Sequence, residues 1–128
     1  MTKKVRQSVF EKYNGLCAYT GKPLGDDWQV DHVNSKHLCN YFGSDDVNNM
    51  ENLLPACGIV NHYKRAFDLE RFRTYMMTFH LRLSKLPKTT RRPKTQKRKE
   101  YMMKVAELFG ITPDKPFSGK FYFELLTK

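Results

Sequence analysis

A chain of 128 residues is long enough for one domain with its own hydrophobic core and too short for two ordinary domains. A composition of 40% hydrophobic and 13% aromatic residues excludes an intrinsically disordered chain. The 23 Lys and Arg residues outnumber the 13 Asp and Glu residues, which gives a net charge of +10. This excess predicts a polyanionic partner, nucleic acid before an anionic membrane, although a solvated basic surface would carry the same charge.

The start of the chain and its cysteines indicate the compartment. No apolar run follows the basic residues at the N-terminus, so no signal peptide is expected. No stretch approaches the roughly 18 apolar residues that cross a membrane. The cysteines, Cys17, Cys39 and Cys57, are odd in number, which favours reduced thiols over a disulfide framework. We therefore expect a cytoplasmic protein without a membrane partner.

The first half of the chain predicts a helix followed by two short strands. Residues 5–13 have the apolar spacing of an amphipathic helix, and residues 16–24 predict two extended pieces around a turn. Residues 28–33 alternate as a strand. The polar loop 34–51 is unusually long, which makes it a candidate binding element. Residues 52–56 predict a second strand, confined to a sheet edge or end by its proline.

Two helices are predicted next. Residues 57–66 form the first, with Asn61, Lys64 and Arg65 close together on one face. Asp68 can cap a longer helix that reaches to about Leu86. Its apolar stripe has the spacing of a core face: Leu69, Phe72, Met76, Phe79 and Leu83.

The last third of the chain is dominated by positive charge. Residues 88–99 contain no hydrophobic residue and seven cations, which predicts a mobile or DNA-ordered arm, with a solvated linker as the alternative. Residues 100–108 predict a third helix, which Gly110 stops. Aromatic residues recur in 117–126, which predicts a strand or a pair of strands packed on the body of the domain.

Asp31 and His32 form a pair suited to phosphodiester cleavage. Neutral histidine can activate water near pH 7, and an adjacent carboxylate offers a hard oxygen ligand for a metal. Neighbours on a strand point to opposite faces, so the two side chains would flank a phosphate from two directions. An oxygen donor from the following helix would complete the protein share of a Mg²⁺ site.

Four segments in order resemble the HNH endonucleases. They are Asn14-Gly15-Leu16-Cys17-Ala18-Tyr19-Thr20-Gly21, Val30-Asp31-His32-Val33, Asn52-Leu53-Leu54-Pro55-Ala56-Cys57 and Asn61-His62-Tyr63-Lys64. The resemblance covers roughly residues 5 to 73. It implies an α+β fold with a ββα-metal core, in which two strands and a helix hold one divalent cation.

The resemblance also implies roles for individual residues. His32 would be the general base, and Asn52 would brace the loop and orient that base. Asp31 would be the first metal ligand and Asn61 the second, an "HNN" variant. His62 is the alternative ligand, but oxygen donors suit Mg²⁺ better than an imidazole does. The expected cofactor is Mg²⁺, or Mn²⁺ or another divalent cation.

A second metal site, found in many members of the family, is not expected here. Those members hold a structural zinc with two Cys-x-x-Cys pairs, whereas Cys17 is followed by Thr20 and Cys57 by Val60. Two sulfurs do not make a closed tetrahedral site, so we predict no structural zinc. Cys17 and Cys57 are instead expected to lie close together as buried apolar residues.

The resulting hypothesis is a DNA endonuclease in one domain, residues 1–128. Residues 5–73 would form the nuclease core, flanked by an N-terminal helix, and residues 74–128 a basic extension of helices and a strand. The cations expected to touch DNA, rather than to be ordinary surface charge, are Lys64, Arg65, Arg91, Arg92, Lys94, Lys97 and Arg98. The alternative is a non-catalytic DNA-binding module on a degenerate scaffold.

The biological setting is left open by the sequence. One active site cuts one strand, so double-strand cleavage would need a homodimer or two sequential nicks. The small size suits a phage or mobile-element protein acting in a bacterial or phage-infected cell, by association only.

Overall fold

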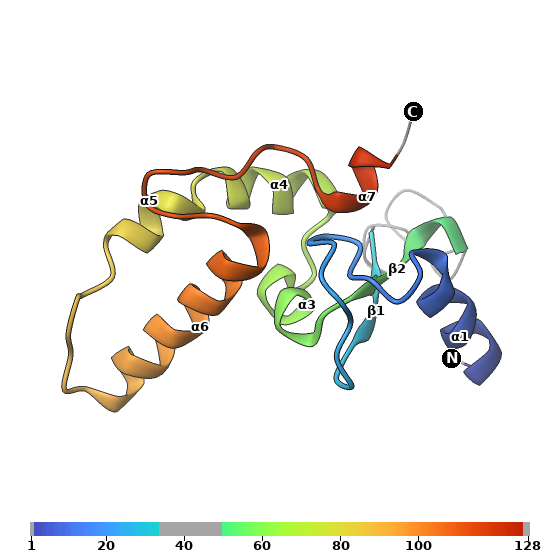
Figure 1. Ribbon diagram of the computed structural model, residues 1–128, viewed down its shortest axis with the longest axis horizontal. Coiled ribbons are helices and arrows are strands. Elements are labelled where there is room, and N and C mark those ends of the chain that lie inside the picture. Colours follow the sequence, from blue (N-terminus) through green and yellow to red (C-terminus); the bar gives the residue numbers. More distant parts are fainter. Residues whose placement is uncertain (1, 34–49, 127–128) are drawn as a thin grey trace. The chain divides into compact units, whose positions relative to one another are not determined.

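The structure is a computed structural model that describes residues 2–33 and 50–126 (Figure 1). Within those ranges the chain is α+β, with six α-helices and one two-stranded antiparallel sheet. Two compact units are present. The first runs to Phe72 and includes the chain from Phe121 onward, and the second is Arg73–Lys120. Most of the predicted loop 34–51, and Cys39 with it, lies outside the described residues.

The first unit begins with the predicted amphipathic helix. Helix α1 (Lys3–Lys12) starts at Thr2, whose hydroxyl accepts the Val5 N–H at 3.2 Å, and buries Val9. The helix ends in a turn that needs glycine at position 15. Gly15 has a φ of +82°, and an added Cβ would lie 3.0 Å from the Phe10 ring.

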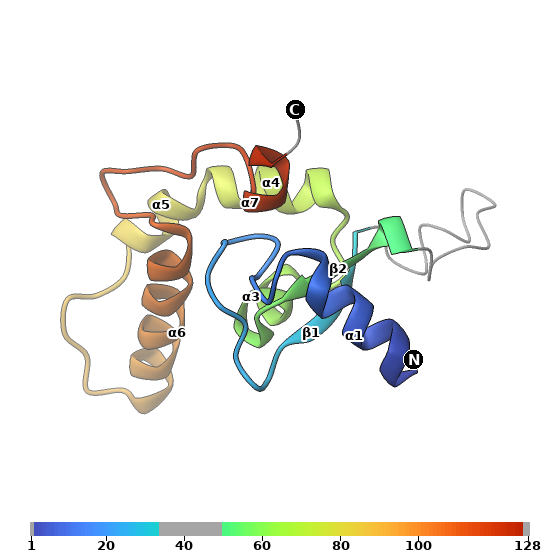
Figure 2. The same cartoon turned by 45° about the vertical axis from the view of Figure 1, so that its right-hand side comes forward.

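The sheet lies beside the helix that follows it (Figure 2). Strand β1 (Gln29–His32) pairs antiparallel with the fully buried strand β2 (Leu53–Ala56), with His32 opposite Leu53. The 3-10 helix η1 (Met50–Asn52) leads into β2. The Pro55 carbonyl accepts the Ala18 N–H at 2.8 Å, so this side of β2 meets a single turn rather than a third strand. The predicted edge position of the proline is confirmed.

Helix α3 (Gly58–Lys64) follows the sheet and ends at Arg65, which has a φ of 57°. Helix α4 (Leu69–Met77) then begins at Asp68, whose carboxylate accepts the Arg71 N–H at 2.7 Å, as predicted.

The single long helix predicted from residue 68 to about Leu86 is wrong. Helix α4 ends at Met77, and α5 (Phe79–Ser84) begins after Thr78. The Arg82 guanidinium donates to the Thr78 hydroxyl at 2.6 Å and to the Tyr75 carbonyl at 2.7 Å. These bonds satisfy groups at the end of α4 and stabilise the break. The middle of the predicted apolar stripe nevertheless faces the interior, because Phe72, Met76 and Phe79 are fully buried, whereas Leu69 and Leu83 are half-buried.

The predicted boundary between a mobile arm and a third helix is also wrong. Helix α6 (Pro93–Phe109) is continuous through most of the segment predicted to be a mobile or DNA-ordered arm. Pro93 suits the first helical turn, and the Lys, Gln and Arg residues after it are good helix formers. The Gln96 amide donates to Glu100 at 3.1 Å, and the far half of the helix is anchored by buried Met102 and Val105.

The strand predicted within 117–126 is wrong as well. No strand follows β2 in the described part of the chain, and the last element is the short helix α7 (Tyr122–Leu125). The Glu124 carboxylate accepts the Phe121 N–H at 2.9 Å, which favours a helical turn. The aromatic spacing serves core packing, because the Tyr19 ring meets Phe121 and Phe123 edge-on at 5.2 and 6.0 Å.

Candidate active site

The end of the β-hairpin brings three of the predicted residues together. Asp31 and His32 are the last two residues of β1, and Asn52 immediately precedes β2. The Val33 N–H donates to the Asn52 carbonyl at 3.0 Å, which extends the ladder beyond the His32–Leu53 pair. Asn52 therefore lies opposite Val33, one position beyond His32 on the neighbouring strand.

Asp31 is the buried acid of this site, with 5% of its surface exposed. The Tyr19 hydroxyl donates to its Oδ2 atom. The Lys64 ammonium lies 3.2 Å from Oδ2 and 3.4 Å from Oδ1. Burial raises the pKa of Asp31 above its usual range, and the nearby positive charge of Lys64 opposes that rise only in part. Burial and the Asp31 charge together hold the pKa of Tyr19 well above its ordinary value.

Lys64 is the last residue of α3, and only 1% of its surface is exposed. Besides Asp31, its Nζ atom donates to the Phe67 carbonyl at 2.6 Å and to the His32 carbonyl at 3.2 Å. The predicted contact of Lys64 with DNA phosphate stays a prediction, and it would require this side chain to leave its buried position. Arg65, by contrast, is exposed.

Asn61 faces the sheet from the middle of α3. Its Nδ2 atom donates to Gln29 Oε1 at 2.5 Å. Gln29 and Asp31 are two residues apart on β1, so their side chains share one face of the strand. Asn61 and Lys64 therefore approach the same strand face, whereas His62, one position along the helix, is exposed.

His32 and Asp31 are consecutive residues of β1, so their side chains lie on opposite faces of the strand. Because Gln29 and Asp31 turn toward α3, Val30 and His32 point to the opposite face of β1. His32 is half-buried there. The two side chains therefore point to opposite faces, as predicted, and their placement on two sides of a phosphate stays a prediction.

The two cysteines of the first unit lie together, as predicted. Cys17 and Cys57 are buried, and the Cys57 N–H donates to Cys17 Sγ at 3.4 Å. A hydrogen bond from the Cys57 side chain lowers the pKa of Cys17 to about 6, with a smaller contribution from Thr20, and raises the pKa of Cys57. The absence of a structural zinc stays a prediction.

The remaining predicted cations belong to the second unit. Five exposed residues lie on the segment before α6 or on its first turns: Arg91, Arg92, Lys94, Lys97 and Arg98. The predicted contacts of these side chains with DNA stay a prediction. The position of Lys94, Lys97 and Arg98 on a helix was not expected from the sequence.

Sequence reasoning missed Tyr19 and Gln29 as members of the site. Tyr19 lies twelve residues before Asp31, and nothing in its spacing indicates a hydrogen bond to that carboxylate. Gln29 could have been found, because it shares the Asp31 face of the predicted strand.

Among residues 2–33 and 50–126, no three His, Cys, Asp or Glu side chains form a cluster that could hold a metal ion. The proposed ligand pair contains one carboxylate and one amide, so it is not a cluster of that kind. No helix in this described part is long and apolar enough to cross a membrane. Comparison with protein families, curated proteins and solved structures found no match to the chain.

Proposed function

We propose that this protein is a divalent-metal-dependent DNA endonuclease of the HNH type. The observation that carries the proposal is the assembly at the end of β1. The hairpin gathers Asp31, His32 and Asn52, and α3 turns Asn61 toward the same strand. The net charge of +10 suits a nucleic-acid substrate.

The donor set fits a hard divalent cation. Asp31 offers carboxylate oxygens and Asn61 an amide oxygen, and Mg²⁺ sites commonly use only one or two protein ligands. The Asp31 carboxylate already pairs with one positive charge, the Lys64 ammonium at 3.2 Å. This position therefore suits a cation. A metal ion could use Asp31 fully only after Lys64 withdraws from one of the carboxylate oxygens.

The residues of the chain would supply the other functions that phosphodiester hydrolysis needs. His32 accepts a proton from the attacking water, because a neutral imidazole is a competent base near pH 7. Asn52 holds the end of the hairpin in place, so the imidazole keeps its direction. When bound, the cation polarises the scissile phosphate and stabilises charge on the leaving oxygen. A Lys64 side chain released from Asp31 would supply a positive charge close to that phosphate.

One observation favours the alternative, a non-catalytic DNA-binding module. Both Asp31 oxygens are engaged, Oδ2 by Tyr19 and both by Lys64, and the carboxyl group is buried. A protein in which this network never opens would bind DNA without cutting it.

Plasmid nicking distinguishes the two functions. The wild-type protein should nick supercoiled DNA with Mg²⁺ or Mn²⁺ and stop when EDTA is added. His32→Ala should lower the rate by roughly 10² to 10⁴-fold, the contribution typical of a general base, while DNA binding persists. A wild-type chain that shifts DNA but never nicks it with either metal would be the binding module.

A further inference from the structure

The first turns of α6 form an exposed, basic helical segment. Arg92 precedes the helix, and Lys94, Lys97 and Arg98 follow at spacings that place them on one side of it. All four residues are exposed. No apolar side chain lies between residues 88 and 99, so this part of the helix has no core face.

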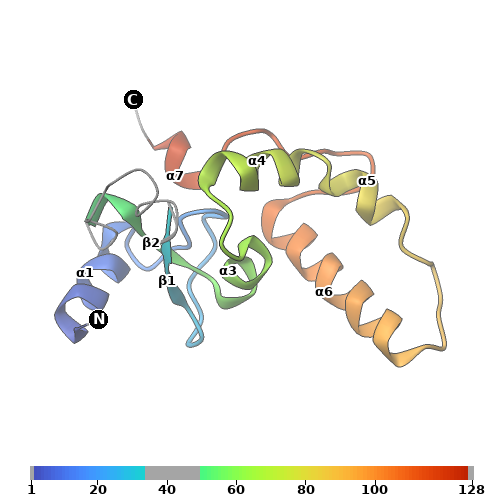
Figure 3. The ribbon, with the colours of Figure 1, turned by 180° about the vertical axis from the view of Figure 1, so that it is seen from behind.

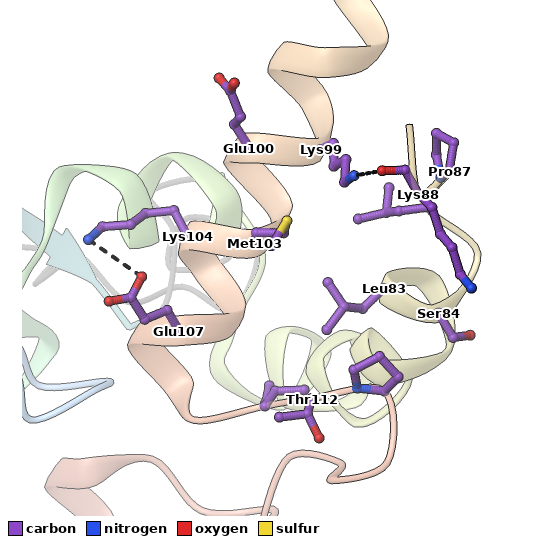
Figure 4. A pocket seen from close by; sticks show the side chains of 13 residues that line it. Leu83, Ser84, Pro87, Lys88, Lys99, Glu100, Met103, Lys104, Glu107 and Thr112 are labelled. Atoms are coloured by element: carbon purple, nitrogen blue, oxygen red, sulfur yellow. Dashed lines mark hydrogen bonds and ion pairs between the residues drawn. The ribbon is translucent and has the colours of Figure 1, made fainter. Parts of the chain in front are cut away.

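The same helix is held firmly at its other end. Met102, Val105 and Ala106 are buried in the second unit, and Gly110 closes the helix in the left-handed conformation with a φ of 69°. Lys99 Nζ donates to the Lys88 carbonyl beside an open pocket of about 880 Å³ between α5 and α6 (Figure 4). Figure 3 shows α6 as one uninterrupted helix whose first turns lie farthest from this anchored end.

An anchored helix with a basic free half has the dimensions of a groove-binding element. An α-helix with its side chains is about 10–12 Å across, and the major groove of B-form DNA is about 12 Å wide. Pro93–Glu100 would extend about 12 Å at 1.5 Å per residue, enough to enter that groove.

We propose that the segment Arg91–Lys99, with its helical part at the start of α6, enters the major groove of B-form duplex DNA as a preformed helix. This proposal takes its partner, DNA, from the proposed function. The exposed Lys94 and Lys97 would contact phosphates, while Arg98, on the same side of the helix, has the side-chain type that reads guanine edges. Duplex RNA would be excluded, because its major groove is too narrow for a helix.

The test separates helical shape from charge at one position. Glu100→Pro and Glu100→Ala remove the same negative charge, but only proline disconnects the basic turns from the anchored half. The anchored half should survive, because proline is tolerated at the first position of a helix that restarts there. Both changes are made in the full-length His32→Ala chain, so that cleavage does not interfere with binding.

Binding to a fluorescent DNA duplex is measured by anisotropy, with thermal melting as the check of folding. We expect Glu100→Ala to bind as tightly as its parent or more tightly, and Glu100→Pro to bind about tenfold more weakly or worse. Prior methylation of guanine N7, which projects into the major groove, should weaken binding of the parent. Equal affinities of the two variants, indifference to N7 methylation, or equal binding of duplex RNA would each overturn the proposal.

Failure of this proposal is distinguishable from failure of the proposed function. If the protein with wild-type His32 nicks DNA, but Glu100→Pro binds as well as Glu100→Ala, the proposed nuclease function stands. The proposal of a groove-binding helix is then wrong. If the variants show the expected binding pattern but the protein with wild-type His32 never nicks DNA, the groove-binding proposal stands and the proposed nuclease function is wrong.

Discussion

The Lys64 ammonium lies 3.2 Å from the Asp31 carboxylate, and both side chains are almost completely buried. A carboxylate proposed as a metal ligand is thus neutralised by a lysine of the same chain. Breaking a buried ion pair leaves an uncompensated charge, whereas removing both charges does not.

Lys64→Met should therefore lower the free energy of unfolding by about 3–5 kcal/mol, measured by urea denaturation. The double variant Lys64→Met with Asp31→Asn should be destabilised by less than the sum of the two single changes. If the change in unfolding free energy of the double variant equals the sum of the two single changes, the two residues are not coupled.

The side chains of Asn61 and His62 point in different directions from α3, so substituting them should affect metal affinity differently. Asn61 contacts Gln29 on β1, whereas His62 is exposed. Asn61→Ala should weaken Mn²⁺ binding by at least about tenfold, and His62→Ala should leave it nearly unchanged, measured by isothermal titration calorimetry. The reverse ranking would assign the ligand to His62.

The Tyr19 hydroxyl donates to Asp31, while the ring packs edge-on against Phe72 at 5.6 Å. Tyr19→Phe keeps the ring and removes the donor, so it should cost about 1.5–3 kcal/mol, the usual contribution of a hydrogen bond to a charged group. Chemical denaturation provides the measurement. Tyr122→Phe is the matched control, and a Tyr19→Phe variant as stable as this control would argue against a bond to an ionised Asp31.

The Cys17 thiol should be largely deprotonated at neutral pH. The Cys57 hydrogen bond lowers the pKa of Cys17 to about 6 from an ordinary value of 9.0. A pKa that is lower in the folded state contributes stability that is fully present above pH 9 and is lost as pH falls through about 6. The raised pKa of Cys57 acts in the opposite direction, so the spectroscopic signal is a cleaner measure than stability.

Ultraviolet absorbance of the thiolate, followed from pH 4 to 8, should show a titration near pH 6. Cys57→Ala should move this step toward ordinary thiol values, because the donor is gone. Cys39→Ala serves as the control and should leave the step in place. A step that persists unchanged in Cys57→Ala would assign it to another group.

The sequence predicted the elements whose patterns are local. Alternation located β1, the proline located the edge position in β2, and Asp68 marked the start of α4. These features depend on residues within a few positions of one another. The resemblance to the HNH endonucleases, rather than any local pattern, predicted that two strands and the following helix would meet.

Features that depend on distant contacts were not predicted. The break at Thr78 is stabilised by the Arg82 guanidinium folding back over the preceding turn. The basic turns of α6 are helical because the helix continues from an anchored half that begins near Met102. The burial of Lys64 was missed for the same reason, since helical spacing alone placed it with the surface cation Arg65.

The Phe72 and Phe121 rings stack at 5.3 Å and 8° between their planes. They are the two residues that flank the second unit, so its entry and exit meet at one point of the first unit's core. The stacked rings hold the two ends of the second unit together. The entropic cost of bringing those ends together grows only slowly with the number of residues between them. A second unit of different length or sequence could therefore stand between these two residues without changing the β1–β2 hairpin.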